Sequence, residues 1–290
     1  MRSAPTFIPQ TFNSPGNLMI DGIFSYLYGF TDFEILLTFI LFTPSISYFI
    51  YLVVWRALGD SSDYHDSFLG IGLFTASFSI CALLLSFTMV QAITTVQTVK
   101  KSVFDEVVVI EELDALLLSH REPEVSKIRG LMKAYVSSVI DEWGFMVKPE
   151  QRMIVSKDLL ILSKLIHGKL PVTPDGQKVF YDKVVSLLND LKKARYYRLQ
   201  HAGKSLPSIY WWAISFLMVN SVVLYSIITR KTKLSAYVLV LPMTALGTIL
   251  GLVVIYDNPF TGDSGVSIEP YKISLQKMEV RENLFKSIDD

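Results

Sequence analysis

Four long stretches of the chain are apolar and contain no Asp, Glu, Lys or Arg. They are Ile35–Val54, Phe68–Ile93, Ile209–Ile228 and Ala236–Ile255. A helix needs about 20 mostly apolar residues to cross the hydrocarbon core of a bilayer. Every backbone amide in lipid must be hydrogen-bonded within the protein, and continuous apolarity, unlike alternation, favours helices over barrel strands. The pattern therefore predicts an all-α integral membrane protein with four transmembrane helices.

Prolines and glycines indicate how two of these spans pack. Pro44 and Pro242 interrupt the first and the last span, and such breaks are tolerated where neighbouring helices satisfy the freed carbonyl groups. Gly247 and Gly251 follow each other at helical spacing on the last span. That spacing permits close approach of another helix, although it is also common by chance. We expect both spans to lie inside a helical bundle.

The segment between the second and third spans has the period of a helix. Apolar residues from Val103 to Leu117 recur every three or four positions and continue the second span. The four spans then form two hairpins around a helical insert. The predicted division is residues 1–32, an N-terminal segment along the membrane interface; 33–95, the first transmembrane hairpin; 96–207, a helical domain; 208–256, the second transmembrane hairpin; and 257–290, a C-terminal tail.

Basic residues are more frequent in the helical insert than in any other segment. Cytoplasmic segments of membrane proteins carry an excess of Lys and Arg, so the insert is predicted to be cytoplasmic. Arg230, Lys231 and Lys233 lie between the third and fourth spans and favour the opposite orientation. The insert carries more basic residues, although long segments weigh less in this rule.

Composition excludes several classes of protein. The chain has 290 residues, of which 51% are hydrophobic and 19% charged, with no net charge. A neutral chain offers no field that attracts nucleic acid. Cys81 is the only cysteine, and the histidines (His65, His120, His167 and His201) are not paired on a helix face, so we expect no metal site and no cofactor. No motif of an enzyme is present either, and we expect a protein that is not an enzyme.

The absence of charged residues from the four apolar stretches narrows the function. Ionisable groups within the membrane mark pumps and coupled transporters. None lies in the four spans, which leaves passive conduction, sensing or scaffolding. Outside them, Glu111, Glu112 and Asp114 form a cluster of carboxylates, which we expect on a solvated helix face.

The second span carries a stripe of polar side chains on one face, with apolar residues beside it. Around an axis shared by several copies, such a face would make a hydrophobic neck that opens into a polar vestibule. Hydrogen bonding of Ser and Thr across helices is the commoner use of such residues and stays open. The candidate pore-lining residues are Phe74, Ser77, Phe78, Cys81, Leu85, Thr88, Gln91, Thr95 and Thr98.

The end of the fourth span, from Tyr256 to Asp263, resembles a known family. It is similar to the Asn-Pro-Phe-Gly-Glu-Asp signature that follows the last membrane helix of bestrophins. The whole chain looks more like the bestrophin-like family of unknown function, whose fourth span ends in a Pro-Phe-x-Gly turn. The residues that carry the match are Asn258, Pro259, Phe260, Gly262 and Asp263.

The resemblance implies a homopentameric ion channel, permeable to anions, with the Phe74–Thr98 face of the second span toward the axis. Two features differ from animal bestrophins. Their calcium site needs an acidic run after the signature, whereas only Asp263 stands here, and calcium prefers several oxygen ligands. Their contiguous aromatic triplet in the pore is also missing, since Phe74 and Phe78 are separated.

The sequence leaves two functions open. The first is an oligomeric ion channel in the cell (inner) membrane or in an organelle membrane such as the thylakoid. The second is a non-conducting scaffold or assembly factor that binds a protein partner through its cytoplasmic helical domain. Both have membrane lipid as a partner and no nucleic acid.

Overall fold

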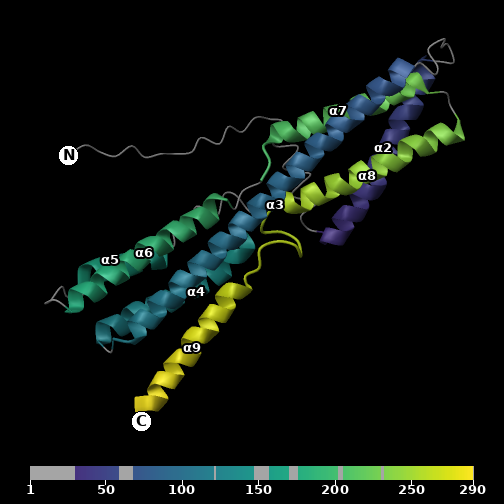
Figure 1. Ribbon diagram of the computed structural model, residues 1–290. Helices are drawn as coiled ribbons and strands as arrows, with labels where there is room; N and C mark the ends of the chain where they lie inside the picture. The colour runs from purple at the N-terminus through teal and green to yellow at the C-terminus, as the bar shows by residue number, and fades with distance from the viewer. Residues whose placement is uncertain are drawn as a thin grey trace, which may run out of the picture. The chain divides into compact units, whose positions relative to one another are not determined.

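The computed structural model describes residues 30–58, 68–120, 122–146, 157–169, 176–201, 205–229 and 232–289. Across these residues the chain is helical and has no strand (Figure 1). The predicted interfacial segment, residues 1–32, lies almost entirely outside them. The helices are α2 (Asp32–Leu58), α3 (Phe68–Leu118), α4 (Pro123–Glu142), α5 (Lys157–Lys169), α6 (Gly176–Gln200), α7 (Ser208–Ile228), α8 (Lys233–Asp257) and α9 (Glu269–Asp289), with a 3-10 turn at Trp143–Phe145.

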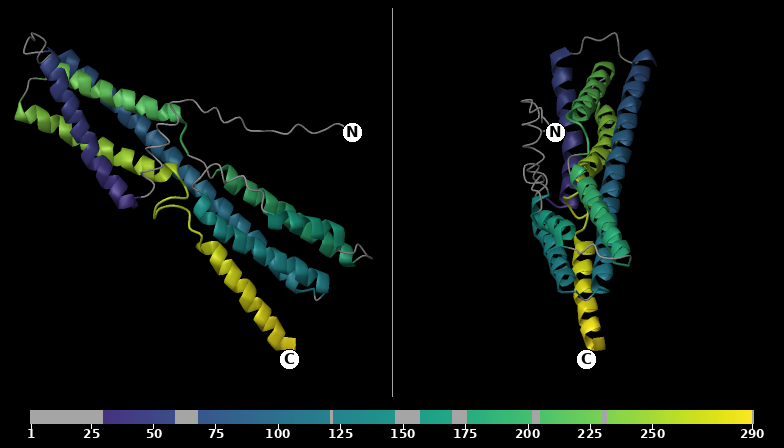
Figure 2. Two further views of the ribbon diagram at one scale, coloured as in Figure 1. Left: turned by 180° about the vertical axis from the view of Figure 1, so that it is seen from behind. Right: turned by 90° about the vertical axis from the view of Figure 1, so that its left-hand side faces the viewer.

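Four of the described helices are long and apolar enough to cross a membrane, namely α2, α3, α7 and α8. The predicted all-helical fold with four helices apolar enough to span a membrane is thereby confirmed. The second span is part of α3, a single helix of 51 residues that Figures 1 and 2 show without a break. At about 1.5 Å per residue its length is more than twice the roughly 30 Å of the hydrocarbon core. A large part of α3 must therefore lie outside lipid.

The chain divides into two compact units, and the first comprises Met1–Ser86 and Pro207–Leu252. Hydroxyl groups join its helices to one another. The Ser77 hydroxyl of α3 lies 2.9 Å from the Ser221 hydroxyl of α7, and the Tyr225 hydroxyl of α7 donates to the Ser235 carbonyl of α8 at 2.7 Å. The core between these contacts is formed by Tyr51, Cys81, Leu85, Ile214, Val222, Tyr225, Leu239, Met243 and Leu246.

Helices α2 and α8 approach closely at the two glycines of the last span. A Cβ atom added to Gly247 would lie 2.6 Å from the Phe39 carbonyl oxygen and 2.8 Å from Thr43 Cβ. At Gly251 the nearest atom would be Phe39 Cβ at 3.2 Å. Any larger side chain at Gly247 would push the two helices apart, so the close helix contact predicted from this spacing is present.

The second unit comprises Phe87–Leu206 and Val253–Asp290. Its core is made by the apolar face of α3 from Val96 to Leu117 together with α4, α5, α6 and α9. Helix α4 packs on both α5 and α9, and α5 packs on α6. The amphipathic pattern of the sequence explains this core, because the apolar residues of α3 that recur every three or four positions are the buried ones.

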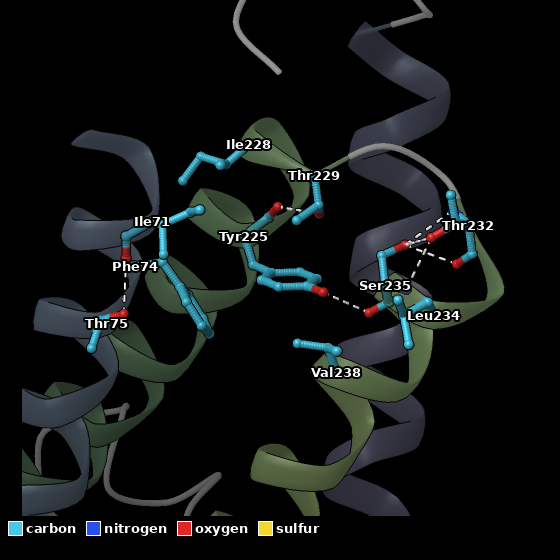
Figure 3. Close-up of a pocket in the computed structure, with 10 residues that line it drawn as sticks. All are labelled: Ile71, Phe74, Thr75, Tyr225, Ile228, Thr229, Thr232, Leu234, Ser235 and Val238. Carbon is cyan, nitrogen blue, oxygen red and sulfur yellow. Dashed lines mark hydrogen bonds between the residues drawn. The ribbon is translucent and has the colours of Figure 1, made fainter. Parts of the chain in front are cut away.

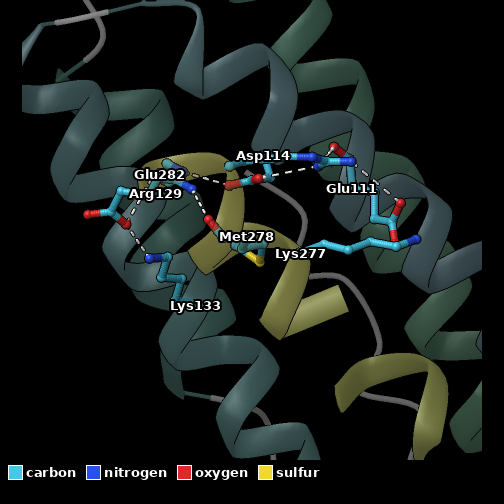
Figure 4. A network of polar contacts seen from close by, with 8 residues as sticks. Glu111, Asp114, Arg129, Lys133, Lys277, Met278 and Glu282 are labelled. Atoms are coloured by element: carbon cyan, nitrogen blue, oxygen red, sulfur yellow. Dashed lines mark hydrogen bonds and ion pairs between the residues drawn. The ribbon is translucent and has the colours of Figure 1, made fainter. Parts of the chain in front are cut away.

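Charged residues join α3, α4 and α9 within the second unit (Figure 4). Asp114 was expected on a solvated face, but it is fully buried, and Arg129 Nε donates to its carboxylate at 2.6 Å. The same guanidinium donates to Glu282 at 3.1 Å and to the Met278 carbonyl at 2.7 Å. The expectation fails because α9, which follows Asp114 far along the sequence, covers this face of α3.

Candidate functional site

The structure covers part of the predicted polar stripe on α3 with the chain's own helices. Ser77, Cys81, Leu85 and Thr88 are all buried. The Ser77 hydroxyl accepts a hydrogen bond from Asn220 Nδ2 of α7 at 3.1 Å in addition to its contact with Ser221. For Ser77, then, the common use of serine in membrane helices, hydrogen bonding to a neighbouring helix, is the observed one.

The other predicted pore-lining residues have mixed surroundings. Phe74 and Phe78 are half-buried, and the Phe74 ring lies 5.0 Å from the ring of Tyr225. Gln91 and Thr98 are exposed. Thr95 is half-buried and accepts a hydrogen bond from the Ser205 hydroxyl at 2.9 Å. The nine residues therefore do not share one environment within the chain.

A different stripe of α3 is exposed over most of the helix. Its residues alternate at spacings of three and four, so they follow the seven-residue repeat of helices that pack around a common axis. We call this stripe the α3 seam. It consists of Leu73, Ala76, Ile80, Leu83, Phe87, Val90, Thr94, Gln97, Lys101, Phe104 and Val108, all of which are exposed.

The signature at the end of α8 forms a compact turn. Asn258 Oδ1 accepts a hydrogen bond from the Phe260 amide at 3.3 Å, and the Pro259 carbonyl accepts one from the Val266 amide at 2.7 Å. Gly262 has a φ of 70°, which is unfavourable for residues with a Cβ atom. At Gly265 an added Cβ would lie 2.6 Å from the Thr261 carbonyl oxygen. The chain thus forms a turn at its Pro-Phe-x-Gly sequence, as the resemblance implied.

The turn is anchored on both sides within the second unit. The buried Asp257 accepts two backbone hydrogen bonds at 2.8 Å, one from Ser205 to its carbonyl and one from Leu206 to its Oδ1. The Phe260 ring meets the Trp143 ring edge-on at 5.1 Å. Asp263 is exposed. The turn therefore fixes the end of α8 to the segment that precedes α7 and to the end of α4.

Next to this turn lies a buried ion pair that sequence reasoning missed. Glu106 and Arg198 are both 0% exposed, and Arg198 donates from Nε to Glu106 Oε2 at 2.7 Å and from Nη2 to Oε1 at 3.3 Å. Tyr135 donates from its hydroxyl to Glu106 Oε1 at 2.5 Å. The Arg198 guanidinium lies 5.7 Å from the ring centre of Tyr271 and 5.9 Å from that of Trp143. Four elements (α3, α4, α6 and α9) thus meet at one carboxylate.

Burial and charge act on the ionisation of this group of residues. Burial lowers the pKa of Arg198, but the Glu106 carboxylate, Tyr271 and Tyr135 together raise it by more, so its pKa lies above the usual range and the guanidinium stays charged. Burial raises the pKa of Tyr135 well above its usual range, and Glu106 raises it further. The same two causes raise the pKa of Tyr271. The arrangement is thus a charged guanidinium paired with Glu106, beside two phenols whose pKa values are raised.

The described residues contain no group of three or more His, Cys, Asp or Glu that could hold a metal ion. A family model described as the bestrophin-like domain matches residues 71–271, whereas no curated protein matches. One solved structure, described only as a crystal structure of a membrane protein, is similar with a TM-score of 0.59 and 12% sequence identity, covering 82% of this chain and 97% of that one.

The family match runs from the start of α3 through the signature turn to Tyr271, and so includes both the seam and the buried ion pair. It spans well over half of the chain. The structural neighbour shares the fold and is itself a membrane protein. This chain belongs to the bestrophin-like family of membrane proteins, as the Asn-Pro-Phe turn predicted.

Proposed function

We propose that this protein is a homo-oligomeric channel, a pentamer as in bestrophins, that conducts anions passively along an axis surrounded by α3. Membership of a channel-type family supports the class of function. The α3 seam supports the geometry. A repeat of seven residues over two turns keeps one stripe of a helix facing a common axis, because the helices then supercoil gently around it. The seam keeps this repeat from Leu73 to Val108 without interruption.

The chemistry of the seam changes along its length. From Leu73 to Val90 its members are apolar, and a ring of such side chains gates by excluding water. Thr94 and Gln97 follow, which are polar and uncharged, and then Lys101. A ring of lysines attracts anions and repels cations. The order of neck, polar zone and basic ring favours anion conduction.

The proposed axial face is shifted from the predicted stripe. Ser77, Cys81, Leu85 and Thr88 are covered by the chain's own helices and so are omitted from the proposed lining. Gln91 is exposed and adjoins the seam. The seam is therefore the observation on which the proposal rests.

The test is flux from liposomes that contain the purified oligomer, with chloride or potassium as the permeant ion. Phe87→Ala shortens a side chain that is 64% exposed on the seam and should increase chloride flux by widening the neck. Phe216→Ala is the matched control, since Phe216 of α7 is 69% exposed but lies off α3, and its flux should equal that of the unmodified protein. A folded oligomer that passes no ion in either gradient would refute the channel. Equal effects of the two substitutions would refute the seam as its lining.

A further inference from the structure

The first unit contains a pocket of about 500 Å³ (Figure 3). This volume lies in the range of sites that bind small molecules, about 300–1,000 Å³. The pocket is formed by the first turns of α3, the last turn of α7 and the first turns of α8, so it lies where three spans reach one surface of the membrane. It is lined by Ile71, Phe74, Thr75, Tyr225, Ile228, Thr229, Thr232, Leu234, Ser235 and Val238.

The entrance of the pocket is apolar. Ile71, Leu234 and Val238 line it and are 54%, 72% and 48% exposed. All three residues lie outside the α3 seam, and large apolar side chains exposed on the outer face of a transmembrane helix contact lipid chains, because the hydrocarbon core is their solvent. The pocket therefore opens toward the bilayer.

The inner wall of the pocket is also largely apolar. Phe74 and Tyr225 pack ring to ring. The hydroxyl hydrogens nearby are used within the protein, since Tyr225 donates to the Ser235 carbonyl at 2.7 Å and Thr229 donates to the Tyr225 carbonyl at 2.6 Å. A ligand in this pocket would gain mainly from burial of apolar surface, at about 25 cal/mol per Å².

A basic residue is the chain neighbour of two residues that line the pocket. Lys233 is exposed and stands in the chain between the lining residues Thr232 and Leu234, at the first residue of α8. A lysine at the end of a span lies at the depth of the lipid head groups, where it attracts anionic phosphates. We propose that this pocket binds an anionic phospholipid of the bilayer, with an acyl chain between Phe74 and Val238 and the head-group phosphate at Lys233.

The test uses the full-length oligomer in nanodiscs of equal parts phosphatidylglycerol and phosphatidylcholine, followed by native mass spectrometry of the released protein. We expect one retained phospholipid per chain, with phosphatidylglycerol in excess. Val238→Trp fills the pocket and should remove most of this lipid. Val219→Trp is the matched control, because Val219 lies on α7 outside the pocket and is 47% exposed, against 48% for Val238. Equal retention by both variants would mean adventitious lipid only and would overturn the proposal.

A second pair of variants tests the role of the Lys233 charge separately from the filling of the pocket. Lys233→Gln should keep the total retained lipid and reduce the preference for phosphatidylglycerol by about fivefold, which corresponds to the roughly 1 kcal/mol of one lysine near an anionic surface. Arg56→Gln, at the end of α2, should leave the preference unchanged. Loss of the preference in both variants, or in neither, would refute the assignment to Lys233. Added inorganic phosphate should not displace the lipid, and displacement would show that free phosphate is the ligand. Because lipid retention is measured without ion flux, this proposal is independent of channel activity.

Discussion

Replacing Arg198 by Met would leave the Glu106 carboxylate in the second unit without its cationic partner. Met retains a long aliphatic chain, so most of the packing volume is kept and the charge is what changes. Both members of the pair are 0% exposed and joined by hydrogen bonds of 2.7 Å and 3.3 Å. Removing one partner of such a pair costs about 3–5 kcal/mol, because a buried charge is left uncompensated. Since whole domains are stable by only about 5–15 kcal/mol, this loss is a large fraction of the total.

Two comparison variants isolate the charge. Lys193→Met changes a side chain on the same helix that is 70% exposed and pairs with Asp190 at 3.3 Å, so it should cost at most about 1 kcal/mol. Glu106→Gln combined with Arg198→Met removes both charges, and the double variant should recover most of the stability because neither ion remains buried alone.

The free energy of unfolding can be measured by urea titration in mild detergent. Trp143 lies beside Arg198 and reports on the second unit once the other three tryptophans (Trp55, Trp211 and Trp212) are replaced by Phe. If Arg198→Met costs no more than Lys193→Met, the ion pair does not stabilise this unit. If the double variant is as unstable as the sum of its single variants, the two charges are not coupled.

Further predictions concern the phenols, the seam and the helix contacts. Because the pKa of Tyr135 is raised in the folded state, the unfolded state loses that proton first as pH rises. Stability is thus fully present below about pH 10 and falls above it by up to about 1.4 kcal/mol per pH unit, a slope that Tyr135→Phe should reduce in urea titrations. Lys101→Glu should lower the chloride-to-potassium permeability ratio in liposomes, whereas Lys193→Glu should not; an unchanged ratio for Lys101→Glu would exclude a basic ring on the axis. Gly247→Ala should destabilise the first unit by about 1–3 kcal/mol through its clash with α2. Gly130→Ala places its Cβ in open space and should raise the stability of the second unit by about 0.5–1 kcal/mol. Equal shifts of the thermal unfolding temperature in the two glycine variants would contradict this contrast.

Local patterns predicted the spans and the turn. The bilayer selects for continuous apolar length, so the four spans can be recognised without knowing their neighbours. Pro259 and Gly262 are equally informative, because each restricts the backbone by itself, and Gly262 has the positive φ that its residue type allows.

Features that depend on contacts between distant segments could not be predicted from the sequence. Asp114 has the sequence context of a solvated carboxylate, and only the later α9 and the cation of Arg129 bury it. Glu106 and Arg198 are likewise far apart in the sequence, and neither has a local pattern that indicates a buried pair. On α3 the polar period was visible, but the hydrogen bonds of Ser77 depend on Asn220 and Ser221 of α7, which no periodicity reveals.

The second unit is built from two separate segments of the chain, and their positions set the order in which it can form during synthesis. Its residues come from Phe87–Leu206 and, after two further spans, from Val253–Asp290. The partners of Glu106 therefore leave the ribosome in sequence, with Tyr135 first, Arg198 later and the covering Tyr271 only after all four spans exist. Elongation at about 5–20 residues per second makes this interval several seconds or more. During that time the nascent domain carries an open core, and a chain that stops at the end of α8 lacks the last piece needed to complete it.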